Sequence, residues 1–114
     1  MNFDVQITPD FLKSLKALSK RYRSIKQDFA IFAESLRENP FQGVELTPGI
    51  RKIRMSITSK GRGKSGGARV ITYTISAAID AGTVYLIDIY DKAEQSTVDV
   101  QLLKNLIKEL FGLD

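Results

Sequence analysis

Residues 49–75 read GIRKIRMSITSKGRGKSGGARVITYTI, a pattern typical of two strands joined by a glycine-rich loop. In its first part, Ile53 and Met55 alternate with basic or hydroxyl side chains, as in a strand with one apolar and one polar face. Residues 59–67 hold four glycines, too many for the interior of a helix or strand. Residues 68–75 are rich in β-branched and aromatic side chains. The stretch therefore predicts a β-hairpin with a long, mobile, positively charged loop.

The residues before this hairpin predict a strand and two helices. Residues 3–7 alternate between apolar and polar side chains, and Thr8 with the proline that follows it supplies a helix N-cap and a first-turn proline. Apolar residues then recur at helical spacing to about Lys20. Ser24 can cap a second helix, which should end before the Asn-Pro pair at residues 39–40. Two helices this close in sequence should form an antiparallel hairpin.

The remaining segments predict a connecting loop before the hairpin, a further strand after it and a last helix. The hairpin and this strand should form a meander of three consecutive antiparallel strands. Residues 41–49 contain Pro and Gly and indicate a connecting loop, while residues 83–89 are typical of a strand that follows a turn. Ser96 or Thr97 should cap a final helix, and Asp99 favours the positive end of that helix. The apolar residues expected on its inner side are Leu102, Leu103, Leu106, Ile107 and Leu110.

This order of elements predicts a single α+β domain over residues 1–114. An antiparallel sheet should pack on the N-terminal helical hairpin, and a C-terminal helix should follow the sheet. Because Lys52 and Arg54 are two residues apart in a strand, both side chains should leave the sheet on the side opposite Ile53 and Met55. We therefore expect the two apolar side chains to face the helices and the basic pair to lie on a face left for function.

Basic residues concentrate in the middle of the chain. The sequence has 17 Lys and Arg against 13 Asp and Glu, which gives a formal net charge of +4. Residues 46–79 hold seven of these bases and no acid, whereas residues 80–114 hold three bases and seven acids. This segregation predicts an anion-binding surface in the middle third. Its bases are Arg51, Lys52, Arg54, Lys60, Arg62, Lys64 and Arg69.

The sequence contains no Cys and no His. Disulfides, thiolate metal sites and cysteine nucleophiles are thereby excluded, as is the commonest general base. Acid–base chemistry must use Lys, Arg, Tyr, Asp or Glu, and we expect neither a cofactor nor a metal. No apolar run approaches the roughly 18 residues of a membrane span, and the first residues lack the features of a signal peptide. We expect a soluble, cytoplasmic protein that does not bind membranes.

The hairpin stretch, together with VYLIDIYDKAEQSTVD at residues 84–99, resembles the RelE/HigB superfamily of bacterial toxins, especially its HigB-like branch. In that branch an RKIR strand, a Gly- and Lys-rich loop ending in GG, an RVI-Y strand and an IY-K-E segment occur in this order and spacing. The N-P-x-x-G turn at residues 39–43 also fits. The resemblance implies a microbial-RNase-like sheet and a toxin of a type II toxin–antitoxin system. Such a toxin is a hydrolase, an mRNA interferase that cleaves mRNA on the ribosome and is inhibited by an antitoxin protein.

The resemblance also implies which residues form the catalytic site. Lys52 and Arg54 match the two basic strand positions of RelE-type toxins, and Arg69 matches the arginine that opens the next strand and contacts the scissile phosphate. Lys92 lies near a later basic position, and Glu94 belongs to the IY-K-E pattern. The chemistry agrees, because attack of a 2′-OH on phosphorus builds negative charge that fixed cations stabilise. We predict that these five residues are catalytic.

Other residues near these positions are predicted to bind RNA or transfer protons. Where RelE-type members have a tyrosine, this sequence has Thr97 and Val98, and the histidine of some relatives is absent. Tyr90 and Asp91 are therefore further candidates for proton transfer. The residues predicted to contact the RNA backbone are Arg51, Lys60, Arg62 and Lys64.

Two other functions are compatible with the same scaffold. ParE-like relatives inhibit DNA gyrase by binding it and need no cleavage residues. A module that binds RNA or the ribosome without cleaving it would also need only the basic surface. The basic trio of Lys52, Arg54 and Arg69 favours the ribonuclease over the gyrase inhibitor.

Overall fold

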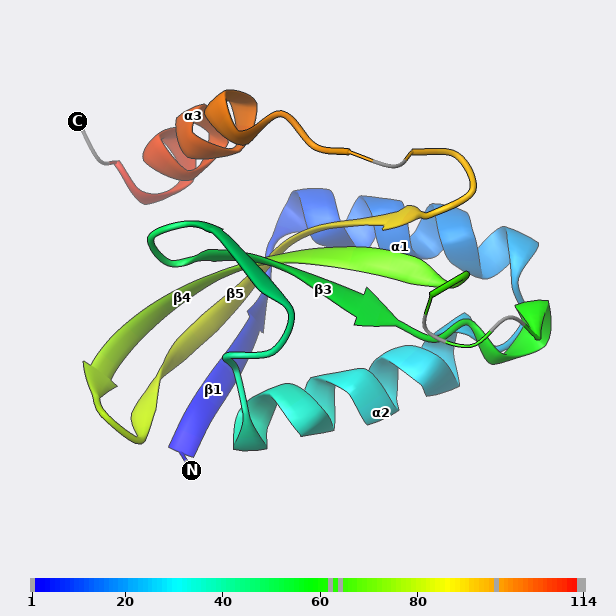
Figure 1. Cartoon of the computed structure of the whole chain (residues 1–114), viewed down its shortest axis with the longest axis horizontal. Coiled ribbons are helices and arrows are strands. Elements are labelled where there is room, and N and C mark those ends of the chain that lie inside the picture. Colours follow the sequence, from blue (N-terminus) through cyan, green and yellow to red (C-terminus); the bar gives the residue numbers. More distant parts are fainter. Residues whose placement is uncertain (1, 62, 64, 96, 113–114) are drawn as a thin grey trace.

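The computed structural model describes residues 2–61, 63, 65–95 and 97–112, in which the chain forms five strands, three α-helices and a short 3-10 turn (Figure 1). None of the helices within these ranges is long and apolar enough to cross a membrane. In chain order the elements are β1 (Asn2–Ile7), α1 (Pro9–Arg21), α2 (Ile25–Glu38), β2 (Val44–Thr47), β3 (Ile50–Met55), η1 (Thr58–Lys60), β4 (Ala68–Ala78), β5 (Ala81–Asp91) and α3 (Val100–Phe111).

The N-terminal helices begin and end close to the predicted residues. Thr8 caps α1, since its hydroxyl accepts a hydrogen bond from the Phe11 amide at 3.3 Å. Ser24 occupies the N-cap position of α2, as predicted, but its hydroxyl makes no capping hydrogen bond to an amide of the helix and donates to the Asp28 carboxylate at 2.7 Å. The second helix ends at Glu38, as the Asn-Pro pair predicted.

The predicted α+β class is confirmed, and the sheet is mixed. Its strand order is β1-β5-β4-β3-β2, with antiparallel pairing from β2 to β5 and parallel pairing between β1 and β5. The parallel pairing places Phe3 of β1 opposite Gly82, so this ring is buried in the core. Alternation in residues 3–7 indicated a strand, but it carries no information about the partner strand or its direction.

The prediction of a loop over residues 41–49 is partly wrong. Residues 44–47 form the edge strand β2, in which Val44 pairs with Lys52 and Glu45 with Arg51, followed by an irregularity in register. Because the flanking Gly43 and Pro48 are typical of loops, the sequence pattern did not indicate this four-residue strand. It matters for the site because β2 covers only the first half of β3.

One face of the sheet packs on the helical hairpin, as predicted. Its core contains Ile53 and Met55, which are 2 % exposed and lie among side chains of α1, α2 and β5 such as Phe11, Leu36 and Leu86. Burying an aliphatic or aromatic side chain of this size contributes about 1.5–3 kcal/mol. Because Ile53 and Met55 point to this face, Lys52 and Arg54 point to the other.

The other face is not wholly open, because α3 covers part of it (Figure 1). Leu103 and Ile107 of this helix pack with Ile71 and Ile87 of the sheet. The predicted caps Ser96 and Thr97 are wrong, since the helix begins at Val100. Asp99 is the cap, and its carboxylate accepts from the amides of Gln101 and Leu102. Ser96 itself lies outside the described residues.

Two of the apolar side chains expected on the inner side of α3 face outward. Leu102 is 65 % exposed and Leu110 is 39 % exposed. Five apolar residues within nine positions cover more of a helix circumference than one sheet face can bury, so packing selects only some of them. The second core therefore occupies the middle of this face and leaves the end nearest residues 52–54 uncovered.

Candidate functional site

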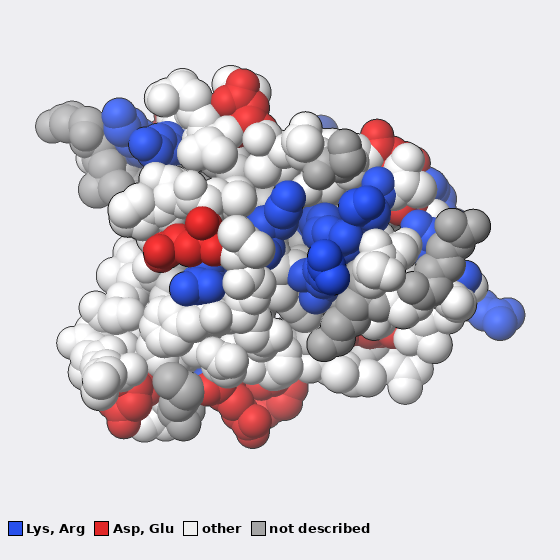
Figure 2. Space-filling model, viewed as in Figure 1, with Lys and Arg blue, Asp and Glu red and all other residues white. Residues whose placement is uncertain are grey.

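An open cleft of about 490 Å³ lies on the sheet face opposite the helical hairpin, at the end that α3 leaves uncovered. Its basic lining residues are Lys52 and Arg54 from β3, Arg69 from β4 and Lys92, which follows β5. Figure 2 shows basic side chains gathered near the middle of the face on which β3 is seen in Figure 1. The structure thus brings together four of the five residues predicted to be catalytic.

Strand register explains why these cations meet. In the β3–β4 ladder Arg54 lies opposite Arg69, and in the β4–β5 ladder Arg69 lies opposite Tyr90. Lys52 is two residues before Arg54 and leaves the same face. The described lining contains no Asp or Glu. Two like charges directly opposite each other are unfavourable in a sheet, and a bound anion would relieve their repulsion.

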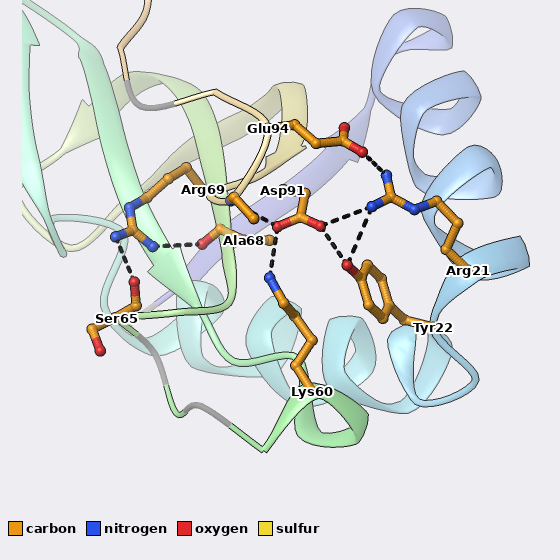
Figure 3. Close-up of polar contacts among 9 residues, drawn as sticks. Arg21, Tyr22, Lys60, Ser65, Ala68, Arg69, Asp91 and Glu94 are labelled. Carbon is orange, nitrogen blue, oxygen red and sulfur yellow. Dashed lines mark hydrogen bonds and ion pairs between the residues drawn. The ribbon is translucent and has the colours of Figure 1, made fainter.

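Arg69 is buried and held in place by backbone carbonyls. The residue is 5 % exposed, and its guanidinium donates to the carbonyls of Ala68 at 3.2 Å and Ser65 at 3.1 Å (Figure 3). Burial, and then the nearby charge of Arg54, lower the pKa of Arg69. A guanidinium nevertheless keeps its proton throughout the physiological range. Arg69 therefore presents a fixed cation and ties the end of the glycine-rich loop to β4.

Two glycines allow the walls of the cleft to approach β3. A Cβ on Gly67 would lie 2.3 Å from the Met55 carbonyl oxygen, and one on Gly43 would lie 2.2 Å from that of Lys52. The carbonyl of Gly67 also accepts a hydrogen bond from the Lys92 amide at 3.1 Å. This contact fixes the segment after β5 next to the start of β4, and it places Lys92 beside Arg69 in the cleft lining.

Asp91 lies in a separate buried network and not in the cleft lining. Its side chain is fully buried and accepts from Lys60 Nζ at 2.7 Å, the Tyr22 hydroxyl at 2.5 Å and Arg21 at 3.2 Å (Figure 3). The Ala93 amide donates to it as well, at 2.9 Å. Burial alone would raise the pKa of Asp91, but the hydrogen bonds from Lys60, Tyr22 and Ala93 lower it to about 2. An always ionised carboxylate suits a structural anchor better than proton transfer.

The remaining predicted residues lie outside the cleft lining. Glu94 forms an ion pair with Arg21, at the end of α1. The side chain of Lys60 is only 11 % exposed, and its ammonium is paired with Asp91. Arg51 donates to the carbonyls of Phe41 at 3.1 Å and Gln42 at 3.2 Å, and its side chain leaves β3 on the face opposite Lys52. Arg62 and Lys64 lie outside the described residues.

Tyr90 is the proton-carrying side chain nearest to Arg69 in the ladder. The residue is 7 % exposed, and its hydroxyl has no hydrogen-bond partner among the described residues. Burial raises the pKa of Tyr90, although the charge of Arg69 opposes this shift. The neutral phenol is thus favoured beside the cationic cleft, although Tyr90 does not itself line it.

Sequence reasoning missed Gln42 and Gly43 in the cleft lining and the network of Arg21 and Tyr22 around Asp91. The N-P-x-x-G turn was a signal for the first pair, because Gly permits a close approach of the backbone to its neighbours. No local pattern indicates the second pair, since Arg21 and Asp91 are 70 residues apart.

No group of three or more acidic side chains is arranged to hold a metal ion in the described part of the chain. A comparison of the chain with models of known protein families finds no match. The chemistry that the site itself supports is the binding of an anion whose oxygens can reach several fixed cations at once.

Proposed function

We propose that this protein is a ribosome-dependent mRNA endonuclease, the toxin of a bacterial type II toxin–antitoxin system. The observation that carries the proposal is the convergence of Lys52, Arg54, Arg69 and Lys92 on one open cleft without an acid in its described lining. Such a cleft suits a phosphodiester backbone, which presents one anionic group after another. The protein would act in the cytoplasm, where ribosomes are, and a cognate antitoxin would restrain it.

In the proposed reaction the 2′-OH gives its proton to a group of the ribosome, its oxygen attacks the adjacent phosphorus, and the bond from phosphorus to the 5′-oxygen breaks. The products are a 2′,3′-cyclic phosphate and a 5′-hydroxyl. The RNA itself supplies the nucleophile, so the reaction needs no co-reactant. Negative charge grows on the phosphoryl oxygens, where the guanidinium groups of Arg54 and Arg69 would hold it. Lys52 and Lys92 would bind the neighbouring backbone.

Proton transfer in this reaction is assigned to Tyr90 and to the ribosome. Tyr90 lies opposite Arg69 in the β4–β5 ladder and burial favours its neutral form, so its phenol is the nearest candidate to donate a proton to the leaving 5′-oxygen. Glu94 and Asp91 are engaged in ion pairs, so they suit this task less well. The free protein should therefore cleave naked RNA poorly, since the 2′-OH lacks a positioning group that the ribosome can supply.

The test is an in vitro translation reaction with purified protein, read by primer extension on the mRNA. We expect cuts at codon boundaries, and their loss when ribosomes are omitted or when Arg69→Ala replaces the parent. The matched control is Arg51→Ala, which removes an arginine that also donates to two carbonyls but lies on the other face. Comparable cleavage with and without ribosomes would contradict ribosome dependence. An intact message with blocked supercoiling would favour the gyrase inhibitor, and an intact message with ribosome binding the non-cleaving module.

A further inference from the structure

A second hollow adjoins the cationic cleft at the rim of β3. It is a cavity of about 210 Å³ between α2 and β3, on the side of the sheet that faces the helical hairpin (Figure 1). Arg54 and Gln42 line both this cavity and the cleft. The edge strand β2 pairs with β3 only as far as Lys52, so no strand of the described chain separates the two hollows at Arg54. A single ligand can therefore occupy both.

The cavity is mainly apolar and large enough for one aromatic ring system. Its apolar walls come from Ile31 and Phe32 of α2 and from Met55 of β3. An apolar cavity of about 150 Å³ in another protein holds benzene, so the 210 Å³ of this cavity accommodate a somewhat larger planar ring. Such a ring would be removed from water by the three side chains around it.

The polar groups of the cavity are placed to accept hydrogen bonds. The side-chain nitrogen of Gln42 donates to the carbonyls of Ser35 at 3.3 Å and Asn39 at 2.8 Å, so the oxygen of this amide is the end left for a ligand. The Asp28 carboxylate has about four acceptor sites, and three donors of the described residues occupy them. A ring that carries an amino group therefore suits the cavity best.

The two hollows together define the chemical class of the ligand. An anion alone would occupy the cationic cleft and leave the cavity empty, whereas an apolar group alone would leave the acceptors of Gln42 and Asp28 unpaired. A nucleotide joins a phosphate to a planar ring whose edge carries hydrogen-bond donors. It thus offers one part to each hollow.

We infer that the 210 Å³ cavity holds one base of the bound RNA and prefers a base with an exocyclic amino group. The base crosses the rim of β3 beside Arg54, whose guanidinium holds the adjoining phosphate. Enzymes that take a base out of its stack recognise it in the same way, by hydrogen bonds to its edge in an enclosed pocket. Cytosine presents an amino group where uracil presents a carbonyl oxygen, so the cavity should distinguish these two pyrimidines. That the ligand is RNA rests on the proposed function.

The experiment measures binding of short RNA probes to the full chain. Each probe is a trinucleotide with abasic outer residues, so only its middle residue can place a base in the cavity. That base is cytosine in the first probe, uracil in the second and absent in the third. All are 2′-O-methylated, because a blocked nucleophile prevents cleavage. In NMR titrations we expect the cytosine probe to bind about tenfold more tightly than the abasic probe, and the uracil probe to lie between them.

The same titrations locate the base. The ring current of a bound base shifts the resonances of methyl groups that lie against it. We expect the methyl resonances of Ile31 and Met55 to shift with the cytosine probe and to stay in place with the abasic probe. Those of Leu102 on α3, which is as exposed as Ile31 at 65 %, should shift with neither.

Ile31→Ala and Leu102→Ala form a matched pair of variants. Both side chains are exposed on helices, so both variants should fold, as a thermal melt will check. Ile31→Ala removes part of an apolar wall and should weaken binding of the cytosine probe about threefold or more, with little change for the abasic probe. Leu102→Ala should leave the affinities of all three probes unchanged.

Equal binding of the three probes would overturn the base site, as would methyl shifts elsewhere or an equal effect of Ile31→Ala on the cytosine and abasic probes. If cytidine 5′-monophosphate binds as tightly as the cytosine probe, the ligand is a free nucleotide and not RNA. Cleavage in the translation assay without a base in the cavity would overturn this site and leave the proposed function standing. Selective binding of the cytosine probe without any cleavage would overturn the proposed function and leave the base site standing.

Discussion

Arg54 of β3 and Arg69 of β4 lie directly opposite each other in the antiparallel ladder. Like charges in this relationship repel each other and destabilise a sheet. A hydrophobic core packs against each face of the sheet that carries the two arginines. A phosphate or carboxylate bound between the two guanidinium groups would weaken their mutual repulsion.

Replacing Arg54 with Gln should raise the free energy of unfolding while it reduces RNA cleavage. Removing one of two opposed charges should contribute about 0.2–1 kcal/mol, and the gain should shrink in high salt. Urea unfolding at two ionic strengths measures this. Lys52→Gln is the control, because Lys52 lies opposite Ile71 and not opposite a cation. A less stable Arg54→Gln protein would mean that Arg54 has a favourable partner in the fold.

Arg69→Ala should abolish most cleavage, and Arg51→Ala should not. Each arginine donates to two backbone carbonyls, so each loss should lower stability by about 1–3 kcal/mol. Only Arg69 lies in the cleft, where loss of one transition-state donor costs about 2.7–4 kcal/mol of barrier. Arg69→Lys should recover part of the activity, since a point charge cannot hold two oxygens. Equal activity of the two alanine variants, after correction for the folded fraction, would place the reaction elsewhere.

Stability should fall in acid because of Asp91. Its pKa in the folded protein is about 2, below the ordinary value of 3.8, so the carboxylate stabilises the fold above about pH 4. That stabilisation, about 2 kcal/mol, should be lost as the pH falls from about 4 to 2. Chemical denaturation at a series of pH values measures it. Asp91→Asn should be less stable at neutral pH and show a flatter profile, and an unchanged slope would assign acid sensitivity to other carboxylates.

Replacing Lys60 with Ala should lower stability, whereas replacing Lys92 with Ala should weaken RNA binding. Lys60→Ala leaves the buried Asp91 with Arg21, Tyr22 and the Ala93 amide, and loss of one partner from a buried pair costs about 3 kcal/mol. Lys92→Ala should leave the melting temperature nearly unchanged and weaken RNA binding, with a smaller salt dependence of affinity. A Lys60→Ala protein that is fully stable but binds RNA weakly would restore the predicted RNA-binding role of Lys60.

Tyr90→Phe should lower the cleavage rate about 10²-fold without lowering stability. The hydroxyl makes no hydrogen bond within the described residues, so its removal costs the fold little. The loss of a general acid accounts for the change in rate. Tyr85→Phe is the control, because Tyr85 lies on the same strand and packs on the same core. Parent-like cleavage by Tyr90→Phe in single-turnover reactions would make Tyr90 a packing residue alone.

Much of the candidate site follows from the period of a strand. Lys52 and Arg54 share a face because they are two residues apart, and a glycine-rich hairpin loop returns the chain so that Arg69 lies next to them. Local rules of this kind also predicted the cap at Thr8, the end of α2 and the faces of Ile53 and Met55. Each depends on residues within a few positions of one another, where side-chain direction is fixed by backbone geometry.

Contacts between distant segments were decided only by the tertiary structure. The parallel pairing of β1 with β5, the partial cover by α3 and the network that joins Arg21 and Lys60 to Asp91 all depend on which surfaces meet after collapse. That network is why Asp91 and Lys60, grouped by sequence with the catalytic and RNA-binding residues, lie in a buried ion pair. A carboxylate taken from water needs cations and hydrogen-bond donors around it, and the fold recruits them from wherever they are within reach.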